Sequence, residues 1–415
     1  MRAPVVLSSL LLFAALGACA VASSDASGGG ASSSSGGSEN GDPNAPSGTF
    51  DPSKPDASDT DPGTTQCTPS ALAAEIDGNG CDDDADGKTD VLASCDDTLD
   101  VDGDAEAFAR AIGICKKASA TSWGLVSARY VNGFTRTTPP ADGQHSILDA
   151  FGSAVTPREG KRLGVLSTGY AREYNSASTA KTPFNTQPQY AMQREPDAQF
   201  PQVLVNTKGE PPPGWPKAAS GCPALSTETF DVAAVELVIK VPSNAKGLRF
   251  DFDFYSGEWP QWVCSTYNDG FVAMLSSKAN KSGTWENISF DAKNNPVSVN
   301  FAFFDRCTSG AKTSCKQSSP KTAVCAGGTS ELAGTGFGVI ADYCGYGTDS
   351  TGGGATGWLV SEAPVVPGET ITLKLMIWDT GDFKFDSSVL VDHLHWVTVA
   401  APPAPKTERA PDIVK

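Results

Sequence analysis

The ten residues GLRFDFDFYS, at positions 247–256, decide the fold class because apolar and polar side chains alternate along them. One face of this segment carries the apolar side chains of Leu248, Phe250, Phe252 and Phe254. The opposite face carries Arg249, Asp251 and Asp253. A period of two residues is typical of a β-strand that turns one face towards a core. The segment therefore predicts a strand in a layered β protein.

Short apolar segments on both sides of this one predict further strands. They are VELVIKV (235–241), FVAMLS (271–276), ITLKLMIW (371–378) and VLVDHLHWVTV (389–399). Clusters of Gly, Pro, Asn and Asp separate them and supply turns. Because no regular helical crossovers lie between the strands, the pattern favours an antiparallel, jelly-roll-like β-sandwich. The fold is expected to be mostly β with a few short helices, one of them over 104–117 with Asp104 as its N-cap.

The charge of the chain is concentrated in one stretch. The 415 residues contain 31 Lys+Arg and 48 Asp+Glu, a formal charge of −17. Residues 51–106 hold fifteen Asp and two Glu against two Lys, a net charge of −15. An acidic chain repels phosphate backbones, so no nucleic-acid partner is expected. The acidic stretch is either a solvated spacer or a cation-binding segment.

The N-terminus has the composition of an export signal. Arg2 is followed by a short, mostly apolar run that ends in Leu16-Gly17-Ala18-Cys19. This ending resembles a bacterial lipoprotein signal, in which the cysteine receives the lipid; the alternative is an ordinary secretory signal. The resemblance implies a signal peptide over 1–18, lipidation of Cys19, and membrane attachment through that lipid. The expected location is the cell envelope, attached to the outer membrane and exposed at the surface or in the periplasm.

The rest of the chain divides by composition. Residues 19–66 are rich in Ser, Gly and Asp and have few apolar side chains, so a disordered tether is expected there. Residues 67–104 form an Asp/Cys-rich module, and 105–399 form the β-sandwich domain. Residues 400–415 are expected to be a flexible tail.

Cysteine usage agrees with an exported protein. Without Cys19 an even number remains, and none of these residues forms a CxxC pair. An exported chain with ten such cysteines is expected to form five disulfides. The candidates are Cys67, Cys81, Cys95, Cys115, Cys222, Cys264, Cys307, Cys315, Cys325 and Cys344. The pairing stays open, although Cys81 and Cys95 flank the acidic loop and could staple it.

The Asp/Cys-rich module contains a calcium-loop pattern. In DGNGCDDDADGKTD (77–90), carboxylates alternate and Gly87 follows them at a position where a sharp turn is needed. The predicted ligands are Asp82, Asp84, Asp86, the carbonyl of Lys88, and Asp90. Ala93 stands where an EF-hand has its bidentate Glu, so Asp96 or Asp97 could close the shell. The stretch also resembles short Asp/Cys-rich metal-binding motifs of bacterial surface proteins; the alternative is a solvated acidic spacer.

Three segments of the large domain together resemble a known family. They are LGVLSTGYA (163–171), SGEWPQWVCSTYNDGF (256–271) and PGETITLKLMIWDTGDFKFDSSVLVDHLHW (367–396). This succession is similar to the choice-of-anchor L family of bacterial surface proteins, over roughly 105–397. The resemblance implies a surface-displayed β-sandwich with an adhesion or recognition role and no established reaction.

The same segments carry a second set of oxygen donors. It comprises Glu258, Asn268, Asp269, Asp379, Asp382 and Asp386. Sandwich folds bring loops from the two halves of the chain together, so these residues could form a second metal or ligand site. The alternative is that they cap turns. Tyr255, Trp259, Trp262 and Tyr267 lie nearby and could form a carbohydrate-stacking platform or belong to the core.

Catalytic motifs are sparse. The three histidines are His145, His393 and His395, and the HExxH motif is absent. We therefore expect no enzyme and no organic cofactor, and a lipid-anchored, calcium-stabilised surface protein that recognises a glycan, extracellular matrix or a surface protein. One alternative is an exported polysaccharide hydrolase using Glu258 and Asp269 as acid and base. The other is a purely structural envelope lipoprotein.

Overall fold

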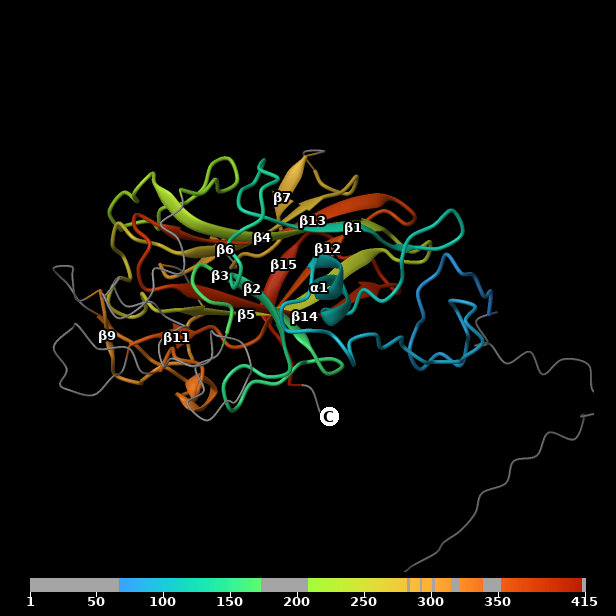
Figure 1. Cartoon of the computed structure of the whole chain (residues 1–415), viewed down its shortest axis with the longest axis horizontal. Helices are drawn as coiled ribbons and strands as arrows, with labels where there is room; N and C mark the ends of the chain where they lie inside the picture. Colours follow the sequence, from blue (N-terminus) through green and yellow to red (C-terminus); the bar gives the residue numbers. More distant parts are fainter. Residues whose placement is uncertain are drawn as a thin grey trace, which may run out of the picture. The chain divides into compact units, whose positions relative to one another are not determined.

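Two antiparallel β-sheets packed face to face make up the body of the protein, as a computed structural model shows (Figure 1). The structure describes residues 67–172, 208–281, 284–291, 293–300, 303–314, 321–338 and 352–412. The predicted signal peptide and tether, including Cys19, lie outside the described residues, as do Cys315 and Cys344. The predicted mostly β sandwich is confirmed.

The first sheet is centred on two long strands, β4 and β13. Its strand order is β1 (Gly124–Val131), β4 (Thr229–Lys240), β13 (Thr370–Thr380), β6 (Gly270–Ser276) and β7 (Trp285–Asn287), with β8 (Val297–Ser298) also pairing with β6. All of these pairings are antiparallel. The strands predicted at 271–276 and 371–378 fall within β6 and β13, and the one predicted at 235–241 overlaps β4 and extends one residue past its end.

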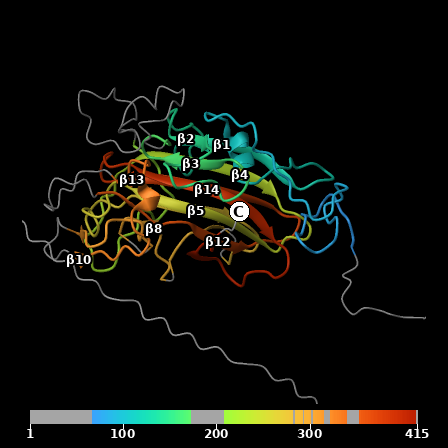
Figure 2. The ribbon, with the colours of Figure 1, turned by 90° about the horizontal axis from the view of Figure 1, so that it is seen from below.

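The second sheet has β5 and β14 at its centre (Figure 2). Its order is β15 (Lys406–Arg409), β12 (Leu359–Pro364), β5 (Gly247–Ser256), β14 (Ser387–Val397), β3 (Leu163–Ser167) and β2 (His145–Leu148), with β11 (Gly354–Ala355) also pairing with β5. The remaining elements are α1 (Ala105–Ala111), a 3₁₀ turn (Ser330–Leu332) and the pair β9 (Lys312–Thr313) and β10 (Lys321–Thr322). β5 has the bounds of the alternating segment in the sequence.

The core between the sheets is formed by the apolar face of β5 and the facing strands of the first sheet. Phe250, Phe252 and Phe254 are fully buried in one cluster with apolar residues of β4, β6 and β13. The rings of Phe252 and Phe271 have centroids 5.0 Å apart, so the two sheets meet through aromatic contacts. Burial of each such side chain stabilises the fold by roughly 1.5–3 kcal/mol.

The polar face of β5 is also buried. A second apolar cluster, which includes Phe151 and Phe337, covers the outside of this sheet. Asp251 and Asp253 are consequently 0% exposed. Asp251 forms an ion pair with Arg158 at 2.6 Å, and Asp253 accepts a hydrogen bond from the Thr356 hydroxyl at 3.1 Å. Buried carboxylates need such partners, because an unpaired buried charge is costly.

The predicted helix is present, although it is shorter than the pattern over 104–117. α1 begins after Asp104, whose side chain accepts a hydrogen bond from the Ala107 backbone N–H at 2.8 Å, as an N-cap does. The chain leaves the helix through Gly113, whose φ of +108° favours glycine. Among the described residues, no helix is long and apolar enough to cross a membrane.

Four disulfides link the described cysteines. They are Cys67–Cys81, Cys95–Cys115, Cys222–Cys264 and Cys307–Cys325. Our suggestion that Cys81 and Cys95 staple the acidic loop together is wrong. Each joins a different partner, so one bridge ties the loop to its own N-terminal end and the other ties its exit to the segment after α1.

The contact between α1 and β3 leaves no room for a side chain at Gly164. A Cβ added there would lie 2.4 Å from the ring of Phe108, which is fully buried. We expect Gly164→Ala to lower the free energy of unfolding by about 1–3 kcal/mol, since the ring cannot move away. Gly270→Ala is the matched control, because its added Cβ would come no closer than 3.3 Å to any atom. Equal denaturant midpoints for the two variants would contradict this packing.

Candidate functional site

Three carboxylates gather in the acidic loop. One ligand oxygen from each of Glu75, Asp82 and Asp84 lies within 4.8 Å of the others, close enough to share a metal ion. Asp84 is buried, whereas Glu75 and Asp82 are half-buried. A partly buried set of three hard oxygen donors fits calcium. Glu75 was missed by the sequence reasoning because it lies outside the D-x-D-x-D-G spacing, seven residues before Asp82.

The other predicted loop ligands are engaged with the backbone. The carboxylate of Asp86 accepts a hydrogen bond from the N–H of Lys88 at 2.8 Å. Asp90 accepts from the N–H groups of Asn79 and Gly80 at 2.9–3.1 Å. Gly87 has a φ of +88°, so the predicted sharp turn is present. The loop is thus held by side-chain to backbone hydrogen bonds, and metal binding stays a prediction.

A lysine supplies positive charge to the loop. The ammonium of Lys116 lies 2.5 Å from a carboxylate oxygen of Asp84, whose side chain is 7% exposed. A calcium ion bound by Asp84 would compete with this ammonium. The loop is also tied to the sandwich, since Ala74 and Asn244 exchange two hydrogen bonds of 2.8 Å. The Trp123 indole donates a further one, at 2.5 Å, to the Ala73 carbonyl.

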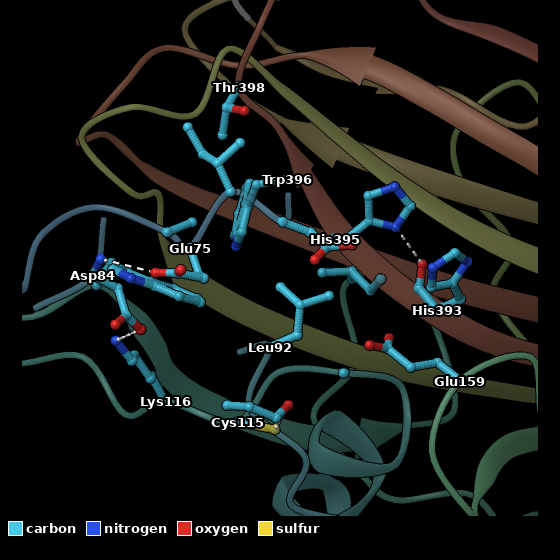
Figure 3. A pocket seen from close by; sticks show the side chains of 17 residues that line it. Glu75, Asp84, Leu92, Cys115, Lys116, Glu159, His393, His395, Trp396 and Thr398 are labelled. Carbon is cyan, nitrogen blue, oxygen red and sulfur yellow. Dashed lines mark hydrogen bonds and ion pairs between the residues drawn. The ribbon is translucent and has the colours of Figure 1, made fainter. Parts of the chain in front are cut away.

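A cavity of about 340 Å³ lies between this loop and the end of β14. Trp123 and Trp396 form an aromatic corner of its wall, with ring centroids 6.0 Å apart and planes at 85°. Glu75 and Asp84 line it from the loop, and Lys116 adds a positive charge (Figure 3). We call this space the loop–sheet cavity. Its size and mixed lining are typical of small-molecule sites.

An irregularity in β14 shapes the histidine side of this cavity. The register against β5 shifts between Asp392 and His395, and His393 has a φ of +53°. A bulge of this kind redirects side chains, and both His393 and His395 line the cavity. The bulge also frees the N–H of Leu394, which donates a hydrogen bond to the Ile112 carbonyl at 2.7 Å.

The two histidines have opposite pKa shifts. Burial lowers the pKa of His393, but its hydrogen bond and charge interaction with Asp251, at 3.1 Å, outweigh burial and raise the pKa overall. Burial and the neighbouring charge of His393 lower the pKa of His395 to about 4. Burial also raises the pKa of Glu159, which faces the same cavity (Figure 3). At neutral pH the cavity therefore combines a neutral imidazole with carboxylates and a lysine.

The second predicted donor set lies near the end of β5, the end of β13 and the start of β14, away from the loop–sheet cavity. Asp269 accepts hydrogen bonds from the Ser387 hydroxyl at 2.8 Å and from the Thr380 N–H at 3.2 Å. Its own N–H lies 3.4 Å from a Glu258 carboxylate oxygen. Asp379 and Asp386 are 1% exposed and interact with each other electrostatically. We call Glu258, Asp269, Asp379 and Asp386 the carboxylate cluster.

Two predicted members lie at the edge of this cluster. Asn268 directs its side chain elsewhere: its amide oxygen accepts from the Asn300 N–H at 2.8 Å. Asp382 is half-buried and accepts from the Lys384 N–H at 3.1 Å. Asp231, which is 3% exposed on β4, interacts electrostatically with Asp379 and was missed by sequence reasoning. The available signal was an acid between apolar residues near the start of the segment TFDVAAVELVIK, which also contains Glu236.

The electrostatics of the carboxylate cluster are dominated by burial. Burial raises the pKa of Asp269 to about 8, although hydrogen bonds from Ser387 and the Thr380 backbone oppose the shift. Burial and the charge of Asp269 raise the pKa values of Asp379 and Glu258 well above the usual range. Glu258 is 2% exposed and Asp269 0%, so a polysaccharide cannot reach this pair without an opening of the structure.

The predicted aromatic platform is mainly part of the core. Tyr255 is 0% exposed and Trp259 is 4% exposed, whereas Trp262 and Tyr267 are half-buried. Tyr255 packs against Phe151, and Trp259 stacks on Phe304. Of the two open alternatives, the structure favours core packing for Tyr255 and Trp259.

Comparison with known proteins gives one match. A family model described as Choice-of-anchor L domain matches residues 165–394, more than half of the chain. The matched region contains the whole carboxylate cluster and extends into the bulge of β14. It begins later than the span of about 105–397 expected from the sequence. No curated protein and no solved structure was found to match.

Proposed function

The chain belongs to the choice-of-anchor L family of bacterial surface proteins, and from this premise we propose that it is a lipid-anchored recognition protein of the cell envelope. In this proposal the lipid on Cys19 attaches the chain to the outer membrane, and residues 19–66 act as a tether. The sandwich then presents a binding site outside the cytosol. Surface location follows from the family, whereas lipid, calcium and ligand are the proposed details.

The loop–sheet cavity is the observation that carries the proposal of ligand recognition. Its aromatic corner, formed by Trp123 and Trp396, suits the apolar C–H faces of a sugar. Carboxylates and Lys116 around the same space can exchange hydrogen bonds with hydroxyl groups. We therefore infer that the ligand is a carbohydrate, bound where the acidic module meets the second sheet.

Calcium has a defined place in this proposal. Glu75, Asp82 and Asp84 would hold the ion, and Glu75 and Asp84 also line the cavity. The bound ion would fix the loop that forms one wall. The affinity of extracellular modules of this type is weak, with a Kd of about 10⁻⁴–10⁻³ M.

Binding should depend on the aromatic corner. We expect Trp396→Ala to weaken carbohydrate binding at least ~10-fold, about 1.4 kcal/mol, because it removes a stacking surface. Glycan-array screening followed by titration calorimetry on the best ligand measures this effect. Trp285→Ala is the control, since Trp285 is half-buried on the outside of the first sheet, away from the cavity. Undiminished binding by Trp396→Ala would rule out this site.

The hydrolase alternative has a distinct outcome in the same experiment. Product release from a bound polysaccharide, abolished by Glu258→Gln, would favour it over recognition. The structural alternative predicts no carbohydrate ligand in the array. Binding without turnover supports the proposal made here.

Calcium should stabilise the protein through the loop. At about 10 mM calcium, a site with a Kd of ~1 mM adds roughly 1.4 kcal/mol to the free energy of unfolding. Asp82→Asn should remove this millimolar component of the stabilisation, measured by calorimetric melting after EDTA treatment and calcium addition. Asp77→Asn, an exposed neighbour outside the three-carboxylate set, should retain it. Identical calcium dependence in both variants would exclude the loop as a calcium site.

The lipid anchor has its own test. In a bacterium that processes lipoproteins, radiolabelled palmitate should enter the wild-type chain, and Cys19→Ser should abolish the label and release the protein from membranes. Ala20→Ser, a change at the neighbouring position, should leave both unchanged. A wild-type chain that carries no label would refute lipid attachment.

A further inference from the structure

The loop–sheet cavity carries an excess of acidic side chains. Two basic side chains, Lys116 and His393, line it. Four carboxylates line the same space: Glu75, Asp77, Asp84 and Glu159. Even with His393 protonated, the acidic groups outnumber the basic ones, and each basic group already has an acidic partner. A cavity with this charge attracts a positively charged ligand and repels an acidic one.

A lysine of the chain itself shows how the cavity wall holds an ammonium group. The Nζ atom of Lys116 lies 2.5 Å from a carboxylate oxygen of Asp84 and 5.5 Å from the centroid of the Trp123 ring. A carboxylate and the face of a tryptophan both attract an ammonium ion, the first through its charge and the second through the cation–π interaction. The hydrogen bond from the Trp123 indole to the Ala73 carbonyl fixes the ring in this position.

Trp396 and His395 add to the same wall (Figure 3). The rings of Trp396 and Trp123 are nearly perpendicular, like the walls of aromatic cages that bind alkylammonium groups. The Nδ1 atom of His395 lies 3.0 Å from the His393 carbonyl oxygen, which can only accept a hydrogen bond. In the neutral imidazole Nδ1 therefore carries the proton, and Nε2 is left as an acceptor. Burial lowers the pKa of His395 to about 4, so the neutral form is present at neutral pH.

Glu159 supplies a carboxylate whose basic neighbours in the chain pair elsewhere. Arg158 pairs with Asp251 at 2.6 Å, and Lys161 pairs with Asp97 at 2.9 Å. Among the ion pairs of the described residues, none contains Glu159. Glu159 is half-buried, and burial opposes its ionised form. An ammonium group of a ligand at this carboxylate would supply a counter-charge.

We propose that the ligand of the loop–sheet cavity is an amino sugar, a carbohydrate with a free amino group that is protonated at neutral pH. The sugar ring lies in the aromatic corner, the ammonium group pairs with Glu159, and Nε2 of His395 accepts a hydrogen bond from the ligand. This inference rests on the proposed function, because it assumes that the cavity binds a carbohydrate. It adds the charge of the ligand and gives Lys116 an opposing role, since its ammonium repels that of the sugar.

Acetylation of the amino group tests the proposal, because it removes the charge and keeps the sugar. Short oligomers of glucosamine and of N-acetylglucosamine are titrated calorimetrically into the full chain, with and without calcium. The free-amine oligomer should bind at least ~10-fold more tightly than the acetylated one, and its affinity should fall as salt is added. Equal or tighter binding of the acetylated oligomer would overturn the inference and leave carbohydrate recognition standing.

Two variants change the charge of the cavity in opposite directions. Glu159→Gln should weaken binding of the free-amine oligomer at least ~10-fold and leave that of the acetylated oligomer unchanged. Lys116→Met should strengthen binding of the free-amine oligomer at least ~3-fold, because it removes a like charge. A lysine that donates hydrogen bonds to a neutral sugar would give the opposite sign. Glu228→Gln is the control, since it removes an exposed carboxylate outside the cavity lining and should change neither affinity.

The remaining outcomes also decide. Undiminished binding of the free-amine oligomer by folded Glu159→Gln overturns the inference, and if this variant does not fold, the sign of the Lys116→Met effect decides alone. Binding of a lysine oligomer without binding of either sugar would assign the cavity to a basic peptide and overturn the inference. If neither oligomer binds but the glycan array gives another ligand, only the amino-sugar inference fails, whereas an array without any ligand refutes the proposed function as well.

Discussion

Strand β5 is buried on both faces, and the protein has to compensate for each acidic group that this strand and its continuation carry into the interior. One face holds the phenylalanines that join the two sheets. The other face places Asp251 and Asp253 beneath a second apolar layer. A few residues further on, Glu258 enters the carboxylate cluster. Because an unpaired buried charge costs several kcal/mol, the arrangement of neighbouring elements is constrained by these three acids.

Each acid is compensated differently, and the differences have functional consequences. Asp251 forms an ion pair with Arg158 and raises the pKa of His393. Because His393 lines the loop–sheet cavity, this buried acid affects the charge of the cavity wall. Asp253 accepts a hydrogen bond from Thr356, and burial keeps its pKa high. Glu258 meets other carboxylates instead of bases, and burial together with the charge of Asp269 keeps its pKa high. The three acids on β5 and in the segment after it thus have different kinds of partner.

The bulge in β14 couples the sandwich to the acidic module. It leaves the N–H of Leu394 available to the end of α1, and α1 leads directly to Cys115 and Lys116. The disulfide Cys95–Cys115 then fixes the exit of the loop, while Lys116 reaches Asp84. The cavity exists because these contacts hold a charged loop over the aromatic corner. Ligand recognition and calcium binding would consequently affect each other.

The sequence by itself determined the long strands β4, β5, β6, β13 and β14, the helix cap at Asp104 and the family. These features depend on local periodicity and on short motifs, which can be recognised without knowledge of the tertiary contacts. It also named all four members of the carboxylate cluster, because Asp and Glu stand out beside apolar strands. Only the tertiary structure decided which donors meet: Glu75 joins the loop carboxylates, Asp231 approaches Asp379, and Asn268 turns away. It also decided the disulfide pairs and showed that Tyr255 and Trp259 are core residues. These features depend on which segments far apart in the chain come close together, and the spacing of residues along one strand does not determine this.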